Sequence, residues 1–142
     1  MPLHEHARSL SPIRNPKRLQ AAELNNLCGA CHRKPAAAGD DTDWTNAWNT
    51  RHQPLYLAQS ACFNKSNGKL SCTSCHAAHT TTVKTVCSEC HTRPRHTTAV
   101  VAGRACVSCH MPAVQAAPNL RFANHWICVY ARGAPLRPRS AR

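Results

Sequence analysis

Three copies of one five-residue pattern stand close together between residues 72 and 110: Cys72-Thr73-Ser74-Cys75-His76, Cys87-Ser88-Glu89-Cys90-His91 and Cys106-Val107-Ser108-Cys109-His110. A fourth copy, Cys28-Gly29-Ala30-Cys31-His32, lies upstream. In a chain of 142 residues with ten Cys and ten His, chance alone predicts C-x-x-C-H about 0.05 times. Its fourfold occurrence indicates that the four segments share one chemical task.

C-x-x-C-H is the pattern at which c-type haem is attached, because its two thiols add to the vinyl groups of a porphyrin and its imidazole binds the iron. We therefore expect four covalently attached c-type haems. The predicted attachment residues are Cys28, Cys31, Cys72, Cys75, Cys87, Cys90, Cys106 and Cys109, and the predicted proximal iron ligands are His32, His76, His91 and His110. Two zinc sites of four thiolates each are the alternative, but such sites do not need a His after every second Cys.

The remaining sequence offers little material for a conventional core. Only 42% of the residues are apolar and 5% aromatic, ten are Pro, and the aliphatic residues are scattered rather than periodic. We predict a multihaem cytochrome c fold of short α-helices and loops wrapped around covalent haems, with little or no β-sheet. The expected organisation is an extended lead-in over residues 1–15, a tetrahaem cytochrome c domain over 16–131 and a mobile basic tail over 132–142.

A few local signals place elements around the motifs. Asn15-Pro16 predicts a helix start, and a partial apolar stripe then leads into the first motif. A second helix, over residues 55–62, is predicted after Pro54, with His52 just ahead of it. Residues 33–43 have the composition of a loop and residues 64–68 that of a turn.

The chain is strongly basic, with 18 Lys and Arg against 6 Asp and Glu and a net charge of +12. Such a balance suits acidic redox partners, a membrane face or nucleic acid. The basic residues are dispersed and do not alternate with aromatic residues, so we predict no nucleic-acid binding. No apolar run reaches about 18 residues, so no membrane span is expected. The expected partners are redox proteins or other cytochrome domains.

Counting the candidate ligands points to two imidazoles on each iron. Besides the motif imidazoles the chain has six further histidines, His4, His6, His52, His79, His96 and His125. Met111 is too close to His110 to reach the far face of the same haem, which disfavours Met ligation. Four haems thus match four internal spare histidines, and we expect His52, His79, His96 and His125 to be distal ligands. A solvated or hydrogen-bonding role is the alternative for any one of them.

The spacing of two of these histidines favours ligation across haems. If residues 76–79 form a helical turn, His76 and His79 project from one face, and His79 cannot bind the opposite side of the same iron. His96 follows His91 at short distance and invites the same argument. We therefore expect distal ligands to come from neighbouring motifs, which would keep the haems close together.

Several stretches, Arg51-His-Gln-Pro-Leu55, Gln59-Ser-Ala-Cys-Phe63, Gly68-Lys-Leu-Ser-Cys-Thr-Ser-Cys-His-Ala-Ala-His79, Cys106-Val-Ser-Cys-His-Met-Pro112 and Asn124-His-Trp-Ile127, resemble the C-terminal part of bacterial multihaem c-type cytochromes with doubled C-x-x-C-H motifs. These proteins are related to the tetrahaem cytochrome of ammonia oxidisers, and the resemblance covers residues 13–138. It implies that the same four spare histidines are distal ligands.

Electron transfer is the function that these patterns favour. A haem-based reductase or oxidoreductase of small nitrogen or sulfur compounds is the alternative, but it needs an iron with an open position, and the ligand count leaves none. Cys62 and Cys128, outside the motifs, are expected to form a disulfide or to be two buried thiols.

Because bacteria attach c-type haem outside the cytoplasm, a periplasmic or extracellular location is expected. The N-terminus lacks the charged-then-apolar pattern of a secretory signal. We therefore expect an export signal upstream of residue 1. The resemblance to multihaem cytochromes implies further haem motifs there as well. His4 or His6 is then a ligand of such a haem, with solvated side chains as the alternative.

Overall fold

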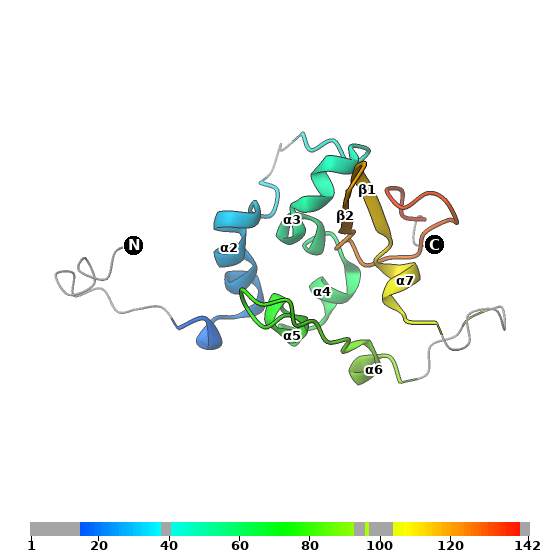
Figure 1. Cartoon of the computed structure of the whole chain (residues 1–142). Coiled ribbons are helices and arrows are strands. Elements are labelled where there is room, and N and C mark those ends of the chain that lie inside the picture. Colours follow the sequence, from blue (N-terminus) through cyan, green and yellow to red (C-terminus); the bar gives the residue numbers. More distant parts are fainter. Residues whose placement is uncertain (1–14, 38–40, 93–95, 97–103, 140–142) are drawn as a thin grey trace.

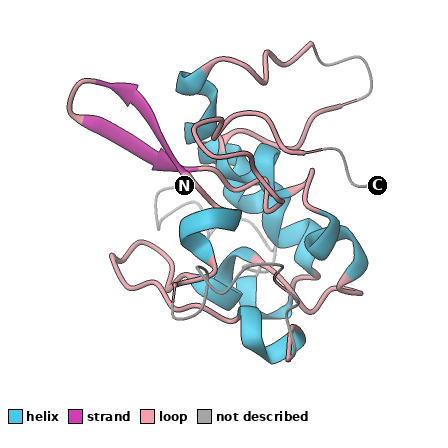
Figure 2. Ribbon diagram, turned by 90° about the vertical axis from the view of Figure 1, so that its right-hand side faces the viewer, coloured by secondary structure: helices cyan, strands magenta, loops and turns pink. Residues whose placement is uncertain are grey.

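The computed structural model describes residues 15–37, 41–92, 96 and 104–139. Its described part consists of short helices joined by loops and one two-stranded sheet (Figures 1 and 2). In the view of Figure 1, the helices that carry the four C-x-x-C-H segments follow one another around the helices α3 and α4. The predicted lead-in, with His4 and His6, lies outside the described residues apart from Asn15.

The first motif lies at the end of the longest helix, α2 (Ala21–His32). A separate 3₁₀ turn, η1 (Pro16–Arg18), precedes it, and the side chain of Asn15 accepts a hydrogen bond from the Lys17 N–H at the start of that turn. The single predicted helix is divided because Leu19 and Gln20 have extended backbone conformations. The expectation that a helix delivers the first motif is confirmed.

Two short helices follow η2 (Ala47–Arg51), namely α3 (Gln53–Leu57) and α4 (Ala61–Lys65). The helix expected over residues 55–62 is therefore wrong in its bounds, because the chain is extended at Ser60. Helix α3 packs against α2, where the Asn25 side-chain amide donates a hydrogen bond to the carbonyl of Pro54 (3.0 Å). The turn expected over residues 64–68 occurs only at 66–68, because Asn64 and Lys65 belong to α4. Gly68 takes a φ of 77°, which a residue with a side chain adopts only with strain.

The remaining motifs lie on one-turn helices, α5 (Cys72–Cys75), α6 (Cys87–Cys90) and α7 (Val107–His110). One turn brings the two cysteines of a motif, three positions apart, to the same side of the helix. Helix α5 ends at Cys75, and His76 is extended, with φ −109° and ψ 135°. The helical turn expected over residues 76–79 is therefore wrong, and His79 has a φ of 58°.

A β-hairpin follows α7, with β1 (Ala113–Ala117) paired antiparallel to β2 (Leu120–Ala123). It lies beside η2, where the rings of Trp48 and Phe122 pack edge to face at 6.3 Å. Val114, on β1, is only 2% exposed. Within the described residues, this hairpin is the only β-sheet.

The apolar core is small and sits around α3. Within the described residues the buried apolar side chains are Ala21, Leu24, Leu55, Tyr56, Leu57 and Val114. Trp44 extends this core, since its ring packs edge to face on Tyr56 (5.1 Å) and on Trp126 (5.3 Å). Six buried apolar side chains are few for a chain of this length.

Part of the segment expected to be a mobile tail makes specific contacts. The Arg139 N–H donates a hydrogen bond to the carbonyl of Val129 (2.7 Å), and Tyr130 forms a bridge with Pro138. The side-chain amide of the buried Asn124 donates to the carbonyl of Pro135 (2.9 Å). Residues 132–139 thus fold back onto the segment after the hairpin, because backbone groups there have partners despite the high content of Pro and Arg.

None of the helices among the described residues has the length and apolar character required to cross a membrane.

Candidate haem-binding site

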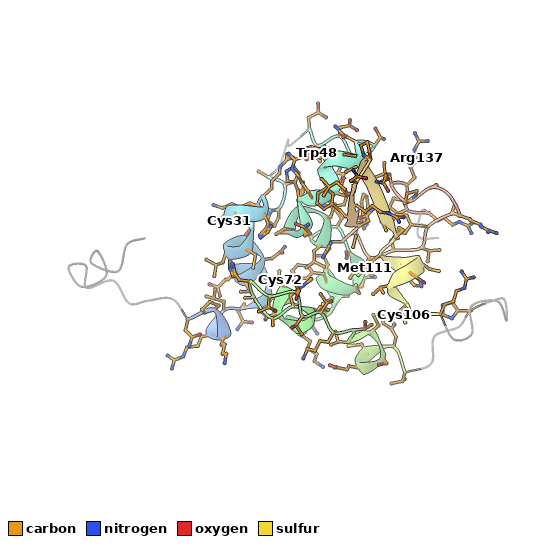
Figure 3. The ribbon with its side chains drawn as sticks, viewed as in Figure 1. Cys31, Trp48, Cys72, Cys106, Met111 and Arg137 are labelled. Carbon is orange, nitrogen blue, oxygen red and sulfur yellow. The ribbon has the colours of Figure 1, made fainter. Side chains whose placement is uncertain are left out.

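The eight motif cysteines are free thiols at or near the surface. Cys31, Cys90, Cys106 and Cys109 are exposed, and the other four are half-buried. Figure 3 shows Cys31, Cys72 and Cys106 on separate elements spread across the molecule. The four motifs therefore lie on separate elements, and the first, third and fourth motifs each have at least one exposed thiol.

The first cysteines of successive motifs meet in space. The Cys72 thiol donates a hydrogen bond to the Asn25 side-chain oxygen (3.5 Å), and burial, together with the neighbouring Cys28 thiol, raises the pKa of Cys72 to about 12. Burial also raises the pKa of Cys87, and the nearby Cys106 contributes to that shift. The first motif thus adjoins the second, and the third adjoins the fourth.

These sulfur contacts do not form a zinc site. Four thiolates around one ion would have to lie within bonding distance of a single point. All eight motif cysteines are described, and the described residues contain no group of three or more His, Cys, Asp or Glu side chains arranged to hold a bare metal ion. The arrangement therefore does not favour the zinc alternative.

Two motif imidazoles each face a histidine predicted to be a distal ligand. The ring centres of His76 and His125 are 6.0 Å apart, with 23° between the ring planes. Those of His110 and His96 are 6.2 Å apart, with 53° between the planes. Two imidazoles that bind one metal ion from opposite sides, each with a nitrogen at about 2 Å from the metal, have ring centres about 6 Å apart. Both separations match this value.

Backbone carbonyls hold one nitrogen in each of these pairs. The Nδ1 of His110 lies 2.8 Å from the carbonyl oxygen of Cys128, and the Nδ1 of His125 lies 2.9 Å from that of Ala123. Because a carbonyl only accepts hydrogen bonds, Nδ1 must carry the proton in both rings. The lone pair is then on Nε2, and metal-binding histidines are commonly held in this way.

The imidazole of His125 is also kept neutral. Burial is the main cause that lowers its pKa to about 4, and the neighbouring His76 adds to the shift, while the bond to Ala123 opposes it. At neutral pH this ring therefore has an unprotonated Nε2, as a metal ligand requires. The segment is fixed by Ser60, whose hydroxyl donates to the carbonyl of His125 (2.9 Å) and accepts from the N–H of Ile127 (2.7 Å).

His52 lies in a different environment, at the start of α3. Its Nδ1, the side-chain oxygen of Gln53 and the hydroxyl of Tyr56 are buried and have no hydrogen-bond partner in the described part of the chain. A buried polar atom without a partner costs about 1–3 kcal/mol. Burial, followed by the charges of Arg51 and Arg33, lowers the pKa of His52. Orphaned polar atoms of this kind fit a site that a bound group completes.

The other predicted ligands are not paired. Among the described histidines, the structure does not place His32, His52, His79 or His91 opposite another imidazole.

Cys62 and Cys128, the two cysteines outside the motifs, are both free and half-buried, and burial raises the pKa of Cys62.

No sequence pattern indicated the groups that hold His125. Ser60 is a single serine whose partners lie more than sixty positions away, and the carbonyls of Ala123 and Cys128 leave no signature in the sequence. No family model, no curated protein and no solved structure matches this chain. The resemblance to multihaem cytochromes therefore stays a prediction, based on the residues quoted for it.

Proposed function

We propose that this chain is an electron-transfer multihaem c-type cytochrome that carries four covalent haems, each with two imidazole ligands. The observation that carries the proposal is the pairing of motif imidazoles with spare imidazoles at 6.0 and 6.2 Å. Four C-x-x-C-H segments whose thiols are all free support it. So does the small apolar core, because covalent porphyrins would add apolar surface for the short helices to cover.

Each group of residues has a defined part in this function. The motif cysteines attach the porphyrins, and the motif imidazoles bind the irons. The carbonyls of Ala123 and Cys128 orient two of the imidazoles and fix the proton on Nδ1. Haem supplies a centre that gains and loses one electron, and bis-imidazole ligation favours potentials toward the negative end of the c-type range.

The location follows from the proposed cofactor. Since bacteria attach c-type haem outside the cytoplasm, the chain would act in the periplasm or at the cell exterior, with redox proteins or other cytochrome domains as partners. Its net charge of +12 suits an acidic partner surface.

Cofactor content tests the first part of the proposal. The chain is produced behind an export signal in a bacterium that matures c-type cytochromes, and haem per chain is measured by pyridine haemochrome and intact mass. Four haems are expected for the native chain and three for the double variant C28A/C31A. The control C62S/C128S also changes two cysteines but should keep four. Absence of a sharp reduced α-band together with bound zinc would overturn the haem proposal.

Kinetics separates electron transfer from the reductase alternative. The reduced protein is mixed with nitrite or hydroxylamine in a stopped-flow instrument, and the oxidation rate is followed against substrate concentration. With every iron six-coordinate, we expect a slow, linear dependence. Saturable turnover at enzyme-like rates, about 1 s⁻¹ or more, would support the reductase instead.

A further inference from the structure

We propose that His125 is the distal ligand of the haem attached at Cys72 and Cys75, and that His96 is the distal ligand of the haem attached at Cys106 and Cys109. This inference rests on the proposed function and deepens it, because the sequence predicts which histidines are distal ligands but not which iron each one binds. Each of these two haems would then have a distal ligand from outside its own motif.

The ring geometry supplies the pairing. His125 faces His76 at 6.0 Å although the two residues are far apart in the sequence, and His96 faces His110 at 6.2 Å. His96 therefore lies opposite a later motif and not opposite His91, its nearest motif imidazole along the chain. His52 and His79 then remain for the haems on His32 and His91.

Separation alone does not distinguish ligands from packed rings, because aromatic rings also pack with centres about 4.5–7 Å apart. The hydrogen bonds make the distinction. Packing needs no particular tautomer, whereas both His110 and His125 have Nδ1 held by a carbonyl, which leaves Nε2 free to bind a metal. Within the His76 pair, Ser60 adds a second restraint by bonding both the carbonyl of His125 and the N–H of Ile127.

The environment of His125 agrees with a ligand that meets its iron from a fixed position. Its backbone follows the buried Asn124, whose side chain bonds the carbonyl of Pro135 and the N–H of Trp126. Trp126 packs on Trp44, which itself packs on Tyr56 in the core. The His125 segment is thus joined by specific contacts to the small core around α3, opposite the imidazole of His76 just after the short helix α5.

A cross of variants identifies the iron that each distal histidine serves. H125A should convert one of four haems from low spin to high spin, measured by electron paramagnetic resonance (EPR) and by the absorption spectrum. In a C72A/C75A background that haem is absent, so adding H125A should create no high-spin haem. In a C106A/C109A background it should still create one. H96A should show the reverse pattern. H4A, a histidine change outside the ligands predicted for these four haems, should leave all four low spin.

Single variants give a second readout if a background fails to load its three haems. The EPR signal of a low-spin ferric haem depends on the angle between the planes of its two imidazole ligands. In this structure the ring planes are 23° apart for His76 and His125 and 53° apart for His110 and His96. H125A should therefore remove the signal of a near-parallel pair, and H96A that of a strongly tilted pair. Added imidazole should return H125G to low spin, because it fills the vacated position.

The outcomes separate the two levels of the argument. If the native chain carries four haems but H125A still creates high-spin haem in the C72A/C75A background, the pairing is overturned while the haem proposal stands. The same holds if neither H125A nor H96A changes the spin state. A protein without haem overturns the proposed function itself.

Discussion

Replacing Ser60 by Ala should destabilise the protein by about 2–3 kcal/mol. The Ser60 side chain, which is fully buried, makes one hydrogen bond to the carbonyl of His125 and one from the N–H of Ile127. Each bond contributes about 0.5–1.5 kcal/mol net, and a buried group left without a partner costs about 1–3 kcal/mol. The loss is large against the roughly 5–15 kcal/mol by which a domain of ordinary size is stable.

The measurement is unfolding of the purified, cofactor-loaded protein in guanidinium chloride, followed by the fluorescence of its tryptophans. The midpoint should fall while the slope is unchanged, since the mutation does not alter the surface exposed on unfolding. S108A is the matched control, because the exposed Ser108 hydroxyl bonds only groups close to it in the sequence, the carbonyl of Ala105 and the sulfur of Cys109. Its change should stay within about 0.5 kcal/mol. If S60A and S108A have the same midpoint, Ser60 does not fasten the His125 segment as argued.

Two further predictions concern other parts of the fold. G29A should lower stability by about 1–3 kcal/mol, measured by the same unfolding assay, because its Cβ would lie 2.6 Å from the Cα of Lys34. The control G133A, where no atom lies within 4 Å but φ is 77°, should cost about 1 kcal/mol; a smaller effect for G29A would contradict the close approach. Iodoacetamide should modify Cys62 more slowly in the folded than in the unfolded protein at neutral pH, because burial raises its pKa and only the thiolate reacts. The difference should shrink as pH rises through the native pKa, and equal rates at neutral pH would refute it.

The sequence predicted the parts of this structure that depend on local patterns. The helix leading into Cys28 and the turn ending at Gly68 both follow from nearby residues. His96 and His125, which pair with motif imidazoles, were also predicted as ligands. The count of haems and spare histidines identifies them without any knowledge of where they lie in space.

What failed depends on contacts beyond each residue's immediate neighbours in the chain. The hairpin was missed because its first strand, Ala-Val-Gln-Ala-Ala, lacks clear strand propensity and is stabilised by pairing and by η2. The helix expected over residues 55–62 is interrupted where Ser60 bonds residues 125 and 127. The helical turn expected after His76 is absent because His76 instead bridges Val83. In each case a tertiary contact overrides a local preference.

The contact between Ser60 and residues 125–127 also bears on the order of events during biosynthesis. A chain is made from its N-terminus, so the last three C-x-x-C-H segments, which lie between the two ends of this contact, are complete before Ile127 exists to close it. Closure of so long a loop is slow compared with local helix formation. Under the proposed function, haem would be attached to these cysteines before the contact between Ser60 and residues 125–127 has formed. Formation of that contact, which brings His125 to its place, would be the last step of folding.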